Sequence, residues 1–158
     1  MIYRQEKEPY LFNFSGTAQQ ILFNSYGDPC TKGWGTNWLM NWRIRKDFEW
    51  FPADTICVHN AFQPLLFNAF KQLEDLDLHS EINTFEEAFC IRFINGSTSV
   101  LSVHSWGAAL DLNAEENPLG SNGIWSKEFI SVMHQNGIYC GQRWDGRKDP
   151  MHFSMVNG

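Results

Sequence analysis

Two histidines and two aspartates stand at spacings that could build a hydrolytic metal site. His104 and Asp111 are seven positions apart with Gly107 between them, and Asp149 precedes His152 by three positions. Zinc takes imidazole nitrogen and carboxylate oxygen as ligands, and a catalytic zinc site keeps one position for water. A tight reversal at Gly107 would bring His104 and Asp111 to one ion, with His152 as the natural third ligand. Asp149 then remains as a carboxylate that can accept a proton.

Other residues could carry a different chemistry. His79 follows a helical pattern in an acidic polar loop and is expected to face solvent, and His134 lies in an expected helix, where a surface or core role is commoner. His59 ends an apolar run and could line a cleft. Ser102 or Ser105 could enter a Ser–His–Asp triad, but no Gly-x-Ser-x-Gly context surrounds either serine. The metal site is therefore the favoured hypothesis.

Two longer motifs surround these residues: Ser102-x-His104-x-x-Gly107-x-Ala109-x-Asp111-Leu112-Asn113 with Asn117-Pro118, and Trp144 with Asp149-Pro150-Met151-His152-Phe153. Together they resemble the D-alanyl-D-alanine carboxypeptidase/L-alanyl-D-glutamate peptidase family of zinc peptidases. Upstream, Arg92-x-Ile94-x-Gly96-Ser97 is similar to the segment that precedes the first motif in the branch containing phage endolysins. The resemblance covers about residues 55–156 and implies the fold shared with the hedgehog signalling domain.

The resemblance also implies roles for individual residues. One zinc ion would be held by the two histidines and the first aspartate, His104, Asp111 and His152. Asp149 would be the catalytic base, and Arg92 and Ser102 would help to position or polarise the substrate. Two positions depart from the family pattern: Ser154 stands where glutamate is frequent, and Cys140 stands where glycine is usual. The serine predicts weaker support for the neighbouring histidine ligand.

These implications define a function hypothesis and its alternatives. We expect a zinc-dependent peptidase that hydrolyses an amide bond in peptidoglycan stem peptides, as a phage or prophage endolysin of the L-alanyl-D-glutamate endopeptidase type. The alternatives are a D-alanyl-D-alanine carboxypeptidase of bacterial wall metabolism and a non-catalytic zinc-containing binding module of the same fold. The basic residues Arg143, Arg147 and Lys148 would suit a substrate that carries carboxylates, although a solvated surface loop explains them equally well.

Composition and charge indicate which broad classes of protein are compatible with this chain. The chain has 158 residues, 43% hydrophobic and 19% charged, which suits one globular domain over residues 1–158 with its motifs within 55–156. A net charge of -6 argues against a general nucleic-acid binder. No run approaches the roughly 20 apolar residues of a membrane span, and no apolar secretory core is visible near Met1. We expect a monomer without membrane insertion, made in the cytosol, that acts on the cell wall after release.

The order of the helices and strands expected from the sequence predicts an α+β domain with a mainly antiparallel sheet flanked by helices. The expected helices span 17–26, 61–78 and 126–136, and the expected strands span 55–59, 89–94, 100–103, 109–112 and 152–156. Apolar residues at helical spacing make 61–78 the firmest element. The tryptophan-rich stretch 28–52 fits no period, apart from a short strand near 38–44. It could be a flap that faces the substrate or a cover for one face of the sheet.

Overall fold

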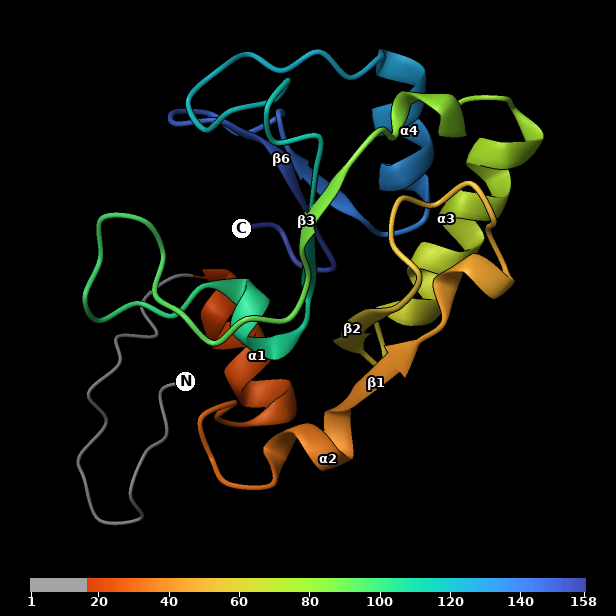
Figure 1. The fold of residues 1–158 in the computed structure, drawn as a ribbon. Coiled ribbons are helices and arrows are strands. Elements are labelled where there is room, and N and C mark those ends of the chain that lie inside the picture. Colours follow the sequence, from red (N-terminus) through yellow and green to blue (C-terminus); the bar gives the residue numbers. More distant parts are fainter. Residues whose placement is uncertain (1–16) are drawn as a thin grey trace.

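Residues 17–158 of the chain are described by a computed structural model, which shows an α+β arrangement (Figure 1). The helices are α1 (Thr17–Tyr26), α2 (Trp34–Trp38), α3 (Gln63–Asp75) and α4 (Lys127–Gln135). The strands are β1 (Leu39–Trp42), β2 (Ile56–His59), β3 (Phe85–Glu87), β4 (Ala109–Leu112), β5 (Tyr139–Gly141) and β6 (Asp149–Ser154). A 3-10 turn, η3 (Val103–Trp106), leads into β4, and two others span Ile44–Lys46 and His79–Glu81. The predicted fold class is confirmed.

The larger sheet brings together the segments that carry the candidate site. Its four strands run in the order β3-β4-β6-β5, and each neighbouring pair is antiparallel. The ladder between β4 and β6 pairs Asp111 with His152 and Leu110 with Phe153. Successive side chains of a strand point to opposite faces. One face of this ladder is therefore apolar and the other carries the polar pair.

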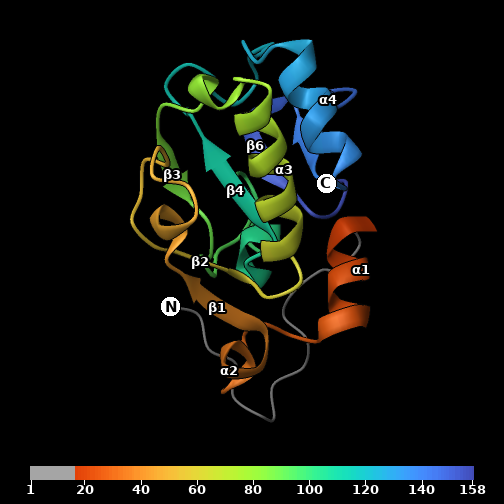
Figure 2. The same cartoon turned by 90° about the vertical axis from the view of Figure 1, so that its right-hand side faces the viewer.

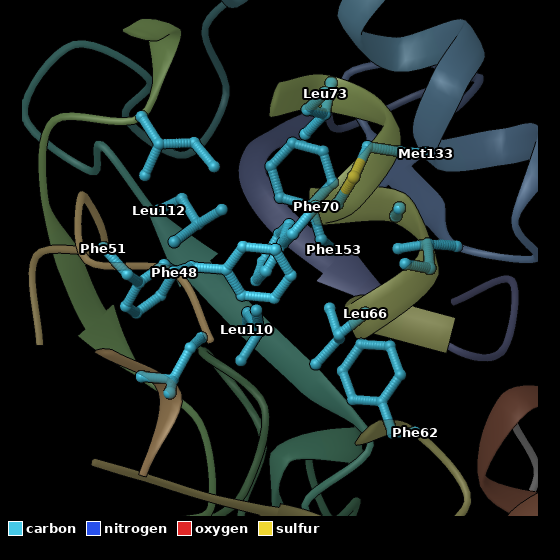
Figure 3. Close-up of a cluster of buried hydrophobic side chains, with 14 of the residues drawn as sticks. Phe48, Phe51, Phe62, Leu66, Phe70, Leu73, Leu110, Leu112, Met133 and Phe153 are labelled. Carbon is cyan, nitrogen blue, oxygen red and sulfur yellow. The ribbon is translucent and has the colours of Figure 1, made fainter. Parts of the chain in front are cut away.

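Helices α3 and α4 cover the apolar face of the larger sheet (Figure 2). The helical spacing in α3 buries Leu66 and Phe70, which belong to the same buried cluster as Leu110 and Phe153 (Figure 3). Burying one such side chain contributes about 1.5–3 kcal/mol. Helix α4 begins at Ser126, whose Oγ accepts a hydrogen bond from the Phe129 amide at 3.1 Å and so caps the helix. These contacts hold the sheet rigidly behind the site.

Helix α1 packs against η3 and the start of β4 in a second buried apolar cluster. The Trp106 indole N–H donates to the Gly27 carbonyl at 2.9 Å, and the Gln19 amide donates to the Leu101 carbonyl at 3.1 Å. Leu22 of α1 is fully buried and belongs to the same apolar cluster as Trp106. The helix nearest the start of the described chain therefore fixes the turn that enters β4.

Several expected elements agree with the structure, and two do not. The helices expected at 17–26 and 126–136 and the strands expected near 38–44 and at 55–59 and 109–112 are confirmed, and 152–156 overlaps β6. The strand expected at 89–94 is wrong, because that segment contributes only the isolated bridge of Phe93 with Leu101. The strand expected at 100–103 is wrong for the same reason, and β3 and β5 pair where no strand was expected.

Residues 1–16 lie outside the described part of the chain, so a single domain over 1–158 stays a prediction. Within residues 17–158, no helix combines the length and the apolar character that crossing a membrane requires.

Candidate metal centre

Three residues from two distant motifs meet at one point of the larger sheet. His104, Asp111 and His152 each offer one ligand atom, and these atoms all lie within 4.8 Å of one another. Nε2 of His104 is 3.1 Å from Oδ1 of Asp111, and Nδ1 of His152 is 3.3 Å from the same oxygen. All three side chains are buried. The structure thus brings together the three residues that the sequence motifs predict as metal ligands.

The turn that carries His104 depends on Ser102 and Gly107. Oγ of Ser102 accepts a hydrogen bond from the His104 amide at 3.3 Å and caps η3. Gly107 then takes a φ of 66°, which favours glycine, and a Cβ there would lie 2.8 Å from the His59 main-chain nitrogen. The chain therefore reverses tightly and enters β4, where Asp111 lies. Ser102 is buried and lines the cleft above this turn.

The outer ring nitrogens of both histidines contact main-chain oxygens. Nδ1 of His104 is 2.7 Å from the Ala88 oxygen, and Nε2 of His152 is 3.2 Å from the Gly158 oxygen. A main-chain oxygen accepts only, so these two nitrogens carry the hydrogens. In neutral imidazole the other nitrogen is then a bare lone pair. Both lone pairs face the same carboxylate oxygen of Asp111.

This donor set fits a divalent metal ion such as zinc. Two imidazole lone pairs and one carboxylate are the ligands of known three-residue zinc sites. Histidines that bind metals usually donate their other N–H to a carboxylate or a main-chain oxygen, as both do here. A cation between the lone pairs and the carboxylate would satisfy all three groups.

The electrostatics of the centre keep Asp111 ionised. Burial alone would raise the pKa of Asp111, but when protons occupy the ring nitrogens that face it, hydrogen bonds from His104 and His152 outweigh burial and hold that pKa well below its usual range. Burial alone would lower the pKa of His104, but the hydrogen bond and charge of Asp111 raise it above its ordinary value. Protons and a metal ion therefore compete for the same ring nitrogens.

Asp149 begins β6 beside this centre and lines the same cleft. Its Oδ1 is buried and has no hydrogen-bond partner among residues 17–158. Burial raises the pKa of Asp149 above its ordinary value, and the nearby charges of His152 and Asp111 also act on it. A carboxylate with a raised pKa and a free oxygen can accept a proton and release it again.

Arg92 reaches the cleft but is paired with a residue that sequence reasoning missed. Its Nε and Nη2 lie 2.9 and 2.7 Å from Oε2 of Glu87, and Nη2 lies 3.9 Å from Oδ2 of Asp111. The same Glu87 oxygen is 3.5 Å from Nδ1 of His104. Glu87 therefore links the arginine to a predicted metal ligand. In the sequence, Glu87 is a charged residue directly before the apolar Ala88. Nothing in that position distinguishes it from a surface glutamate.

The cleft has a volume of about 690 Å³ and a wall of mixed charge. Arg143, Trp144 and Arg147 line it, so part of the predicted basic cluster faces the site. Lys148 instead donates to the main-chain oxygens of Gln142 and Trp144, at 2.8 and 3.2 Å. The loop between β5 and β6 thus offers cations that suit carboxylates.

Other candidates from the sequence lie elsewhere or act as packing. His59 is fully buried among aromatic rings and does not line the cleft, whereas His134 does. No residue of the tryptophan-rich stretch 28–52 lines the cleft, and Trp42 packs in the core, so this stretch covers the scaffold. Cys140 is buried, and burial raises the pKa of its thiol to about 12, which makes it a packing residue.

A buried His–Asp–His set beside an unpaired carboxylate, on an antiparallel α+β scaffold, is the arrangement expected of a metal-dependent hydrolase. Residues 95–155 match the family described as D-alanyl-D-alanine carboxypeptidase, and the chain carries a domain of this family over that segment. Together with the buried candidate metal residues, this match over residues 95–155 indicates a peptidase that acts on peptidoglycan peptides, with the hedgehog/D-Ala-D-Ala peptidase-like fold. The match contains the predicted ligands and Asp149, whereas Arg92 lies outside it. No curated protein matches the chain.

Proposed function

We propose that this protein is a zinc-dependent endopeptidase of the L-alanyl-D-glutamate type, which hydrolyses peptidoglycan stem peptides as a phage or prophage endolysin. The observation that carries the catalytic part is the position of Asp149, whose buried and unpaired oxygen shares a cleft with the His–Asp–His centre. A non-catalytic binding module would have no use for such a carboxylate. We also propose that each monomer binds one zinc ion.

The chemistry divides between the ion and the side chains. His104, Asp111 and His152 would hold the zinc, which when bound supplies a Lewis acid that lowers the pKa of water and polarises a carbonyl. Asp149 accepts the proton of the attacking water and passes it to the leaving amine. Arg92, held by Glu87, presents a fixed cation at the edge of the cleft.

The cleft supports a substrate longer than a terminal dipeptide. Its volume of about 690 Å³ lies in the range that encloses a drug-sized ligand. Arg143 and Arg147 on its wall suit the free carboxylate of a D-glutamyl residue, because guanidinium groups bind carboxylates with two parallel hydrogen bonds. The similarity of the segment around Arg92 to the endolysin-containing branch favours the same substrate.

A D-alanyl-D-alanine carboxypeptidase is the second candidate, favoured by the description of the matching family. The place of action completes the proposal: the protein is made in the cytosol and reaches the cell wall after release, where it acts as a monomer.

Digestion of purified peptidoglycan, read by mass spectrometry, tests the proposal. The endopeptidase reaction produces peptides with a new amino-terminal D-glutamyl residue, whereas the carboxypeptidase reaction releases free D-alanine. Zinc-loaded protein should give the first product, and Asp149→Asn with zinc bound should give neither. Release of D-alanine alone would select the second candidate, and an absence of both products would favour the non-catalytic module.

A further inference from the structure

The chain folds back beyond β6, so that Gly158 contacts a predicted metal ligand. Nε2 of His152 lies 3.2 Å from the main-chain oxygen of Gly158. Ser154, at the end of β6, holds this segment, because its Oγ donates to the main-chain oxygens of Val156 and of Gly158, the latter at 3.4 Å. The oxygen that contacts His152 is therefore fixed within a short hydrogen-bonded return of the chain.

Helix α1 limits the position of Gly158 from the other side. A Cβ added at Gly158 would lie 2.5 Å from the Cβ of Ala18, which is buried. Figure 1 shows this end of the chain between α1 and the sheet. The helix is itself tied to η3 by Gln19 and Trp106. Gly158 is thus confined between a fixed helix and the imidazole of His152.

The two histidines of the centre are supported in parallel ways. His104 directs its outer nitrogen to the Ala88 oxygen at 2.7 Å, and His152 directs its outer nitrogen to the Gly158 oxygen. In each case the contact determines which nitrogen keeps a lone pair for the ion. Ser154, which stands where the family pattern favours glutamate, therefore acts indirectly, through the main chain that it holds.

We propose that Gly158 is a positioning residue of the metal centre. Its main-chain oxygen accepts the hydrogen of His152 Nε2, orients the ring so that Nδ1 faces the ion, and owes its own position to Ser154 and to Ala18 of α1. This inference rests on the zinc site of the proposed function but not on the peptidase reaction. Partners of this kind typically change metal affinity about 10–100-fold.

The test measures the affinity for zinc alone, by competition with a chromophoric chelator at fixed pH. A variant that lacks Asn157 and Gly158 should bind zinc about 10–100-fold more weakly than the full chain. Ser154→Ala should show a smaller loss in the same direction, because the return segment is loosened while the oxygen remains. Asn157→Ala is the matched control and should bind zinc like the unmodified chain, because the main chain is kept.

A second measurement separates positioning from folding. In the zinc-loaded full chain, nitrogen-15 NMR should find a slowly exchanging hydrogen on Nε2 of His152 and a coordinated Nδ1. In Ser154→Ala that hydrogen should exchange faster, even where the melting temperature of the zinc-free protein is unchanged. Zinc affinity that stays within twofold in the shortened variant would overturn the inference, as would coordination through Nε2. If the unmodified chain bound zinc but had no peptidase activity, the proposed function would be contradicted. The role of Gly158 in zinc binding would not be affected by that result.

Discussion

Asp111 and His152 face each other across the ladder between β4 and β6, with Oδ1 and Nδ1 3.3 Å apart. The register of this ladder decides whether the centre exists, because a shift of one residue would turn one side chain to the opposite face of the sheet. The same ladder pairs Leu110 with Phe153, both fully buried in the core. Apolar packing on one face therefore maintains the geometry of the metal site on the other.

Replacing a predicted ligand should abolish metal binding without unfolding the chain. Asp111→Asn removes the anionic ligand and the partner of both imidazoles, so zinc affinity should fall by more than about 100-fold, the upper end for loss of an outer partner. Equilibrium dialysis with metal analysis measures the effect. Asp145→Asn, at an exposed carboxylate of the cleft rim, is the control and should bind zinc normally. Stoichiometric zinc in Asp111→Asn at micromolar concentration would refute the ligand assignment.

Asp149→Asn should separate catalysis from metal binding. The amide cannot accept the proton of the attacking water, so kcat on a stem-peptide substrate should fall about 10²–10⁴-fold. The side chain makes no hydrogen bond through Oδ1 within the described chain, so zinc affinity should change little. Steady-state kinetics and the same dialysis experiment give the two numbers. An active Asp149→Asn enzyme would show that another group handles the proton.

Local patterns made much of the fold and the core of the site predictable. Helix α3 follows from apolar residues at helical spacing, and α4 follows from a capping serine, Ser126. The reversal at Gly107 is also local, because a glycine between His104 and Asp111 allows the positive φ that the turn requires. Such features depend on neighbours along the chain, and the residue types encode them directly.

Contacts between distant segments could not be predicted in the same way. The apolar run at 89–94 was expected to be a strand, but its main-chain groups bond to separate elements: the Phe89 amide donates to the Cys57 oxygen of β2, and the Cys90 amide donates to the His104 oxygen of η3. Glu87 comes to face Asp111 through the pairing of β3 with β4, and its Oε2 lies 3.5 Å from Nδ1 of His104. The support of His152 by Gly158 uses a main-chain oxygen, which every residue type possesses. Tertiary packing decides these contacts, and residue identity does not reveal them.

Arg92→Lys should impair substrate positioning but not metal binding. Lysine keeps the charge but lacks the planar fork with which the arginine contacts Glu87 through two nitrogens, so the cation is no longer fixed in the cleft. We expect kcat/KM on the stem peptide to fall about 10–100-fold, as a small misplacement of a positioning group can cause. Arg45→Lys, whose guanidinium pairs with Asp54 at the surface, is the control. Equal kinetics of Arg92→Lys and the unmodified enzyme would remove the arginine from the site.

His59 should make the fold less stable in weak acid. It is fully buried, its Nδ1 accepts a hydrogen bond from the Ala61 amide at 3.0 Å, and its Nε2 has no partner among residues 17–158. Burial lowers the pKa of His59 from 6.5 to about 4. The unfolded chain therefore takes up a proton below pH 6.5, whereas the folded chain does so only near pH 4. Stability contributed by the neutral ring is complete above pH 6.5 and is lost as the pH falls towards 4.

The matched variant His59→Gln isolates this effect, because the neutral amide keeps an acceptor for the Ala61 N–H and does not titrate. Between pH 7 and pH 5, the free energy of unfolding of the unmodified protein should fall by about 2 kcal/mol more than that of the variant, since one pKa unit corresponds to about 1.36 kcal/mol. Urea denaturation of the zinc-free proteins at the two pH values measures the difference. Parallel losses in both proteins would mean that His59 keeps an ordinary pKa in the fold, and that burial among Tyr26 and Trp38 does not exclude its charged form.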